Sequence, residues 1–163
     1  VKLVEAVFER SLILSSVKDT ESLAFSLSRI AVAGDVICLT GELGSGKTTF
    51  SRYFIKARAL RLGINIFEIP SPTFTLVQVY EIPAGDIWHF DLFRIDHPTD
   101  IYELGIEDAM CHAICLIEWP EKLPNLDLSS RLDVEISFGS VETERTITLS
   151  GGNHWVKRLS GSL

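Results

Sequence analysis

The chain has 163 residues, and 22 Asp or Glu against 15 Lys or Arg give it a formal net charge of −7. A chain of this length predicts one domain that folds without disulfides or a structural metal. Apolar residues make up 46% and charged residues 23%, which excludes a wholly disordered chain, and the acidic balance argues against unassisted binding to nucleic acid. No apolar run reaches the length of a membrane span and no N-terminal signal pattern appears, so we expect a cytoplasmic protein.

The N-terminal part of the chain predicts a strand, a helix and a second strand. Residues 6–14 mix β-branched and apolar side chains and predict an edge strand. Asp19-Thr20-Glu21 has the chemistry of a helix N-cap, and we expect this helix to end near Gly34. The continuous apolar run 36–40 is typical of a parallel strand that is buried on both faces. One face of the predicted helix carries Leu23, Leu27, Ile30 and Ala31.

The middle of the chain predicts a second helix and a hairpin. A glycine-rich turn is followed by a helical pattern from about residue 47 to 60, and residues 64–69 have the composition of a strand. Residues 73–81 and 87–91 also predict strands. The linker 82–86 between these two carries Pro and Gly, so we expect them to pair as a hairpin.

The C-terminal part of the chain predicts both parallel and antiparallel strands. Residues 96–99 indicate a helix start, and the apolar run 113–118 is a second parallel-type strand. Strict alternation along residues 132–138 and again at 147–149 predicts an antiparallel hairpin with one solvated face. Residues 155–159 predict a short closing helix.

A motif with chemical consequences lies between the strand 36–40 and the helix that begins near residue 47. Gly41-Glu42-Leu43-Gly44-Ser45-Gly46-Lys47-Thr48 fits the phosphate-binding pattern G-x-x-x-x-G-K-[ST]. Residues without a Cβ let backbone N–H groups approach phosphates closely, and the helix directs its positive end at the anion. Lys47 would place its charge on the β and γ phosphates, and the Thr48 hydroxyl would ligate Mg²⁺.

This motif, set among the elements above, predicts an α/β fold of three layers with the mixed sheet of a P-loop NTPase. We expect parallel core strands, added antiparallel hairpins and flanking helices, with residues 1–163 forming a single P-loop ATPase domain. No N-K-x-D sequence occurs that would favour guanine, so ATP with Mg²⁺ is the expected cofactor. The residues expected around the nucleotide here are Glu42, Leu43, Gly44, Ser45, Gly46, Lys47, Thr48 and Thr49.

Two predicted strands end in a carboxylate, as phosphoryl-transfer sites of this class require. Glu118 ends the strand 113–118 in the Walker B arrangement, and Asp91 ends the strand 87–91. Either acid can hold Mg²⁺ directly or through water, and Glu118 is the better candidate for orienting the attacking water. We therefore predict Lys47, Asp91 and Glu118 as catalytic, and Thr48, Asp91 and Glu118 as metal-binding.

Three further residues are candidates for the site. Pro72 stiffens the loop 71–74, which would hold the Thr73 hydroxyl near the γ-phosphate unless this is a plain loop entering a strand. Trp119 directly follows Glu118 and lines the nucleotide site if it is not simply a core residue. Arg94 reaches a phosphate or a partner, or else forms a surface ion pair.

Five motifs, in this order, resemble the TsaE family, also called YjeE, over about residues 20–138. They are T-G-E-L-G-S-G-K-T-T-F-S-R (Thr40 to Arg52), S-P-T-F-T-L-V (Ser71 to Val77), H-F-D-L-F-R (His89 to Arg94), E-L-G-I-E-D (Glu103 to Asp108) and I-C-L-I-E-W-P (Ile114 to Pro120). The chain departs from the family pattern at Ser45, where many members have Ala, at Phe93, which is often Tyr, and in the insert at residues 58–63.

The resemblance implies a bacterial ATPase needed for threonylcarbamoylation of the tRNA adenosine next to the anticodon. Such proteins bind the TsaB–TsaD dimer, and their ATP turnover is thought to reset that complex, while TsaC makes the activated threonylcarbamoyl-AMP. Contact with tRNA is therefore expected only indirectly. The resemblance assigns Lys47 and Thr48 to phosphate and Mg²⁺, Asp91 and Glu118 to the two essential carboxylates, and Trp119 to the site beside them. It also places the helix around Thr20 near the adenine.

Two alternatives to a slow, partner-activated ATPase stay open at this point. A small-molecule or nucleotide kinase would need an acceptor pocket and a lid, and no lid-sized insertion is present. A non-hydrolysing adaptor would use ATP only to order a binding surface. Residues 100–145, with 11 acidic and three basic side chains, either keep the protein soluble or form an interface for a basic partner.

Overall fold

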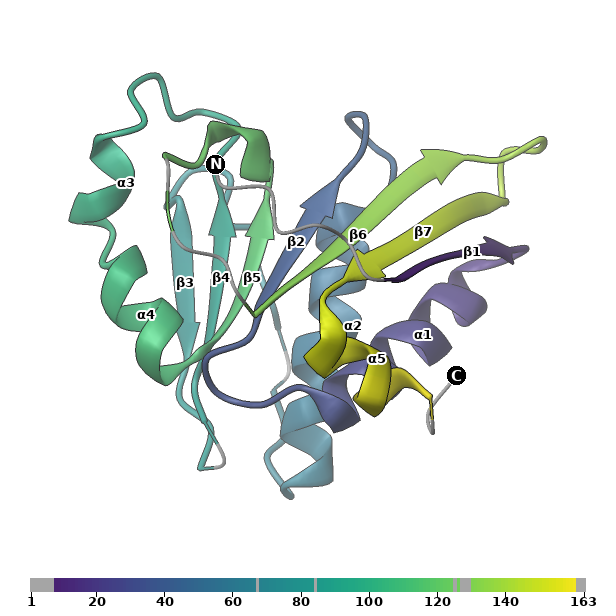
Figure 1. Cartoon of the computed structure of the whole chain (residues 1–163), viewed down its shortest axis with the longest axis horizontal. Helices are drawn as coiled ribbons and strands as arrows, with labels where there is room; N and C mark the ends of the chain where they lie inside the picture. The colour runs from purple at the N-terminus through teal and green to yellow at the C-terminus, as the bar shows by residue number, and fades with distance from the viewer. Residues whose placement is uncertain (1–7, 67, 84, 125, 127–129, 161–163) are drawn as a thin grey trace.

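The computed structural model describes residues 8–66, 68–83, 85–124, 126 and 130–160. They form one seven-stranded sheet in the order β1-β7-β6-β2-β5-β4-β3, with helices on both sides (Figure 1). The strands are β1 (Phe8–Leu14), β2 (Val36–Thr40), β3 (Val77–Tyr80), β4 (Ile87–Asp91), β5 (Ile114–Glu118), β6 (Arg131–Phe138) and β7 (Arg145–Gly151). The helices are α1 (Val17–Ile30), α2 (Lys47–Arg61), α3 (Asp100–Glu103), α4 (Ile106–His112), α5 (Asn153–Leu159) and the 3₁₀ helix η1 (Pro120–Lys122). None of these helices has the length and apolar character needed to cross a membrane.

The centre of the sheet is parallel and its two ends are antiparallel. Strand β2 pairs in parallel with both β5 and β6, and β5 pairs in parallel with β4. Strand β3 closes one end of the sheet antiparallel to β4, while β7 and β1 continue the other end antiparallel to β6. The predicted fold class is therefore confirmed: a mixed three-layer α/β structure with parallel core strands and added hairpins.

Strand β2 is apolar along its length because each of its faces lies against a separate hydrophobic layer. Ile37 and Leu39 point to the layer that contains α1, α2 and α5. Val36 and Cys38 point to the layer that contains α3 and α4. Burial on both faces explains why the sequence shows a continuous apolar run here, whereas β6, with one solvated face, alternates.

Residues 64–69 do not form the strand that their composition predicted. No strand includes the described residues 64–66 and 68–69, although Ile64, Ile66 and Ile69 pack against the core. The Ile69 carbonyl instead accepts a hydrogen bond from Nε of Arg52 at 2.8 Å. Apolar residues of a connecting segment that pack against the core resemble those of a strand, so composition alone did not separate the two.

Predicted boundaries also move, including the end of α1, which lies at Ile30 rather than near Gly34. The N-cap of α1 is Ser16 rather than Asp19: the Ser16 side chain accepts from the Asp19 N–H, and the Asp19 carboxylate accepts from the Ser16 N–H. In the predicted strand 73–81, only residues 77–80 are in a strand, because Leu76 has a φ of 65° that breaks the extended conformation. Residues 6–7 of the predicted edge strand lie outside the described residues.

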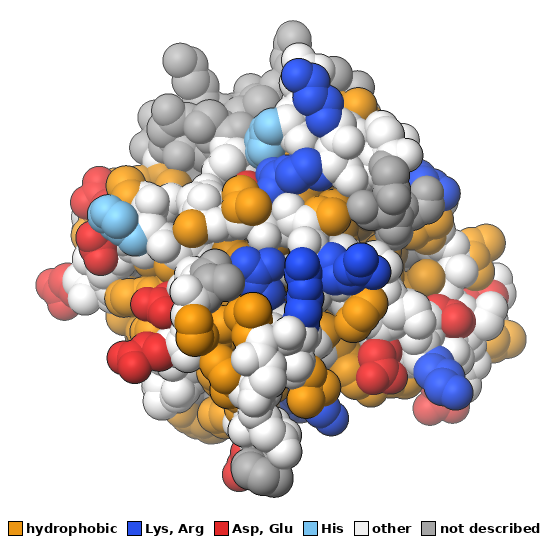
Figure 2. Space-filling view, turned by 90° about the horizontal axis from the view of Figure 1, so that it is seen from below, with side chains coloured by type: hydrophobic (Ala, Val, Ile, Leu, Met, Phe, Trp, Pro, Cys, Tyr) orange, Lys and Arg blue, Asp and Glu red, His pale blue; other side chains and the backbone are white. Residues whose placement is uncertain are grey.

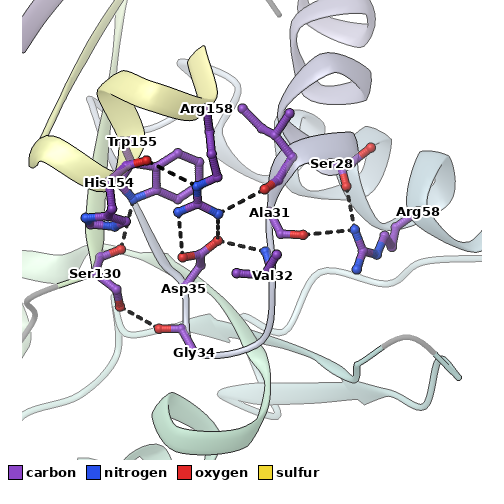
Figure 3. Close-up of polar contacts among 11 residues, drawn as sticks. Ser28, Ala31, Val32, Gly34, Asp35, Arg58, Ser130, His154, Trp155 and Arg158 are labelled. Carbon is purple, nitrogen blue, oxygen red and sulfur yellow. Dashed lines mark hydrogen bonds and ion pairs between the residues drawn. The ribbon is translucent and has the colours of Figure 1, made fainter. Parts of the chain in front are cut away.

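Arginines from α2 and α5 satisfy the carbonyl groups at the C-terminal end of α1. Nη1 of Arg58 donates to the Ser28 and Ala31 carbonyls at 2.8 and 3.0 Å (Figure 3). Nη1 of Arg158 donates to the Ile30 carbonyl at 2.9 Å, and that of Arg61 donates to the Arg29 carbonyl at 3.1 Å. These last carbonyls have no partner within the helix, and cations at a helix C-terminus are favourable.

Basic side chains gather at one end of this acidic protein. Figure 2 shows Lys and Arg side chains in the middle of the face seen from below, the end at which the parallel strands begin. Arg158 also binds Asp35 through Nη1 and Nη2, at 2.6 and 2.9 Å, and so ties α5 to the start of β2 (Figure 3). Part of the positive charge at this end therefore serves to stabilise the fold.

We predict that Arg58→Met lowers the free energy of unfolding by about 2 kcal/mol, because two buried carbonyls lose a charged donor. Chemical denaturation of both proteins measures this. The control Arg29→Met removes an exposed arginine at the same helix end and should change stability by less than about 0.5 kcal/mol. Equal stability changes in the two variants would contradict the role given to Arg58.

Candidate functional site

The loop between β2 and α2 has the backbone shape that its glycines predict. Gly41, Gly44 and Gly46 have φ angles of 140°, 78° and 117°, which residues with a Cβ rarely adopt. A Cβ on Gly41 would also come within 2.2 Å of the Ile136 carbonyl oxygen. Gly46 caps α2, so the helix begins at Lys47 with its free N–H groups facing the loop.

Lys47 lies inside this loop, with only 5% of its surface exposed. Its Nζ donates to the Gly41 and Glu42 carbonyls at 2.7 and 2.9 Å and lies 3.9 Å from the centre of the Trp119 ring. Burial lowers the pKa of Lys47, and the nearby carboxylates of Glu118 and Asp91 oppose that shift. The site thus holds a partly desolvated cation among acceptors and an aromatic face.

Glu118 ends β5 and is 2% exposed. Its Oε2 accepts from the Thr48 hydroxyl at 2.9 Å, and its Oε1 lies 2.7 Å from Nε2 of His89. A buried carboxylate needs such partners because it has lost its hydration. The bond from Thr48 also links the first turn of α2 to the end of β5.

Asp91 ends β4 directly beside Glu118, its partner in the parallel register. The Thr73 hydroxyl donates to Oδ2 of Asp91 at 2.8 Å, and the Phe93 N–H donates to Oδ1 at 3.1 Å. The hydroxyls of Thr73 and Ser71 lie 2.8 Å apart. The loop before β3 is therefore hydrogen-bonded to Asp91.

A cavity of about 190 Å³ brings most of the predicted site residues together. Trp119 closes one wall: its φ of 61° turns the chain sharply after β5, and its ring packs on Phe93 with 4.8 Å between ring centres. Arg94 is exposed and lies over the Phe74 ring, and it does not line the cavity. The residues lining the cavity are Leu43, Gly44, Gly46, Lys47, Thr48, Thr49, Thr73, Asp91, Glu118 and Trp119.

A second cavity, of about 390 Å³, is also lined by this loop. It contains the predicted residues Thr20 and Ser45 and shares Gly44, Gly46 and Thr49 with the first cavity. Glu42 lines neither cavity; its side chain is exposed and only its carbonyl contacts Lys47. The remaining lining residues are Ser16, Val17, Ile136, Glu142, Thr143 and Arg145.

Sequence reasoning missed the wall that the β6–β7 hairpin contributes to this second cavity. Nε of Arg145 donates to the Ser45 carbonyl at 2.9 Å, across 100 positions of the chain. Nothing in the local sequence indicates this contact, since it depends on β6 pairing beside β2. His89 was also missed, although it lies two residues before Asp91 on the predicted strand 87–91 and therefore on the same face of that strand.

The donor set fits a magnesium ion shared with a nucleotide better than a metal held by protein alone. The described residues include no group of three or more His, Cys, Asp or Glu side chains arranged to hold a metal. Mg²⁺ typically takes one or two protein ligands and fills its other positions with phosphate oxygens and water. Because the Thr48 hydroxyl donates its hydrogen to Glu118, its oxygen lone pairs remain available for a cation.

Comparison with known proteins decides the family. The family model described as "Threonylcarbamoyl adenosine biosynthesis protein TsaE" matches residues 14–147. The chain belongs to the TsaE family. The tRNA threonylcarbamoyladenosine biosynthesis protein TsaE of Rickettsia typhi is 39% identical over 125 residues, covering 77% of this chain and 84% of that protein. The protein of the same name from Bacillus subtilis is 30% identical over 139 residues, covering 84% of each chain.

The fold of this TsaE-family chain also matches a solved structure. The crystal structure of Bacillus subtilis YdiB superposes with a TM-score of 0.72 at 27% identity, covering 94% of this chain and 93% of that chain. The resemblance that the five motifs indicated is therefore confirmed, and so is the fold.

We predict that Ser45→Ala leaves the free energy of unfolding unchanged or raises it by up to about 1 kcal/mol. The Ser45 hydroxyl is buried and has no hydrogen-bond partner among the described residues. Ser130→Ala is the matched control, because that hydroxyl donates to the Gly34 carbonyl at 2.5 Å, and its loss should cost about 1 kcal/mol. A loss of stability in Ser45→Ala would show a contact that the structure lacks.

Proposed function

We propose that this chain is the Mg²⁺-dependent ATPase subunit of tRNA threonylcarbamoyladenosine synthesis and acts with TsaB and TsaD in the cytoplasm. In this proposal residues 1–163 form a single P-loop ATPase domain. The observation that carries it is the convergence of Lys47, Thr48 and two buried carboxylates, Asp91 and Glu118, on one cavity beside a glycine loop. The family names of its relatives supply the pathway.

The proposed chemistry depends on charge and position. Phosphoryl transfer needs little covalent help, so a site accelerates it by holding the phosphates and stabilising their developing charge. Mg²⁺ would supply charge neutralisation at the β and γ phosphates, held by Thr48 with Asp91 or Glu118. Lys47 would move its Nζ from the loop carbonyls to the phosphates, and Glu118 would orient the attacking water. The adenine would occupy the cavity that contains Thr20.

The proposal includes slow turnover without a partner. No arginine lines the cavity formed by the described residues around Lys47 and Glu118. An arginine that reaches the transferred phosphate raises turnover by roughly 10³- to 10⁵-fold in related phosphoryl-transfer sites. We therefore infer that the TsaB–TsaD dimer either supplies the missing charge or reorganises the site, and that hydrolysis allows repeated modification cycles.

We predict that Lys47→Ala and Glu118→Ala each lower TsaB–TsaD-stimulated ATP hydrolysis by at least about 100-fold. Lys47→Ala should also weaken ATP binding, whereas Glu118→Ala should retain it, because only the former removes a phosphate contact. Release of inorganic phosphate and calorimetric ATP titration measure the two effects. Glu107→Ala removes an exposed acid on α4 and serves as the control, with expected wild-type rates.

Full stimulated activity in either site variant would overturn the assignment. Transfer of the γ-phosphate to a small molecule, rather than release as inorganic phosphate, would favour a kinase instead.

A further inference from the structure

His89 is a fully buried histidine next to the proposed site, and the chemistry described so far does not use it. It lies on β4 two residues before Asp91, so the two side chains project to the same face of the sheet. Its Nε2 lies 2.7 Å from Oε1 of Glu118. Its Nδ1 has no hydrogen-bond partner in the described part of the chain. The Glu118 carboxylate is thus the one polar group within that part to which this imidazole is bonded.

The two oxygens of Glu118 are held from opposite sides. Oε2 accepts from the Thr48 hydroxyl at 2.9 Å, while Oε1 faces His89. His89 does not line the cavity, so any effect it has on a bound nucleotide passes through Glu118. Oε1 of Glu118 can accept a hydrogen bond from an imidazole that carries its hydrogen on Nε2.

We propose that His89 is a positioning residue of the ATPase proposed above: its Nε2–H holds Oε1 of Glu118, so that Oε2 faces Thr48 and the cavity. The expected effect on turnover rests on the proposed function. The geometry rests on the His89–Glu118 contact alone. Without this donor, the Glu118 carboxylate keeps one bond, to Thr48, and can rotate away from the direction that a water or metal requires.

The unpartnered Nδ1 argues against a role in packing alone. A buried polar atom without a partner costs free energy, and an apolar side chain of similar size would fill the same space without that cost. The neighbouring inward side chain on β4, Ile87, is apolar. A histidine at the position that reaches Glu118 is therefore explained by the bond it makes with that residue.

The side-chain lengths of Gln and Asn provide a matched test. The amide nitrogen of Gln can reach the position of Nε2, whereas that of Asn reaches only the position of Nδ1. We expect His89→Asn and His89→Phe to lower the stimulated kcat by about 10- to 100-fold, with the KM and Kd for ATP changed less than about twofold. His89→Gln should recover kcat to within about threefold of the wild-type value.

Two measurements distinguish a loss of positioning from a loss of folding. ATP affinity and thermal melting show whether each variant keeps its site and its core. The control His154→Phe replaces a second histidine that has an unpartnered buried nitrogen but lies on α5, away from the carboxylates, and should leave kcat unchanged. A kcat of His89→Asn and His89→Phe within twofold of wild type, or an equal loss in His89→Gln and His89→Asn, would overturn the proposal.

A spectroscopic measurement tests the contact without any turnover. Imidazole ¹H–¹⁵N spectra of the full chain should show His89 protonated at Nε2, and this signal should shift in Glu118→Ala but not in Glu107→Ala. A proton on Nδ1 alone, or no response to the loss of Glu118, would overturn the His89 proposal even if the protein hydrolyses ATP. If the wild-type protein shows the expected Nε2–H signal but no stimulated hydrolysis, the proposed function is refuted. The contact between His89 and Glu118 would then stand without a role in turnover.

Discussion

The site depends on the parallel pairing of β2, β5 and β4. Parallel strands end at the same edge of a sheet, so the loop after Thr40 comes to lie beside the last residues of β5 and β4. In this register Leu39 is paired with Glu118, and Glu118 is paired with Asp91. A shift of one residue in β5 would turn Glu118 to the α3–α4 side of the sheet, away from Lys47 and Thr48.

Burial of charge is the second constraint. Lys47, Asp91 and Glu118 are each at most 5% exposed, and each has polar partners that replace its lost hydration. Charges in such surroundings interact more strongly than in water, which suits the triphosphate site proposed above. The same burial makes the site costly to form, and the contacts of Thr73 with Asp91 and of His89 with Glu118 offset part of that cost.

The sequence predicted most of the elements that carry the site because their signals are local. The glycine spacing at residues 41–48 and the carboxylates that end two apolar runs can each be recognised within ten residues. Signals that depend on tertiary structure were missed. The Arg145 contact with Ser45 requires a strand order that composition does not encode, and Ile64, Ile66 and Ile69 pack against the core although none of the described residues 64–66 and 68–69 is in a strand. His89 could be predicted only in part. Its spacing of two residues from Asp91 indicated which face of the strand it occupies, but not that it contacts Glu118.

The most direct test of this account is a crystal structure of the protein with Mg²⁺ and a non-hydrolysable ATP analogue. The account predicts that the β and γ phosphates lie on the loop 41–48, with the metal beside the Thr48 hydroxyl and Asp91 and Glu118 facing it, and with the base in the cavity that contains Thr20. A triphosphate bound elsewhere, or one whose metal has neither carboxylate in its surroundings, would contradict it.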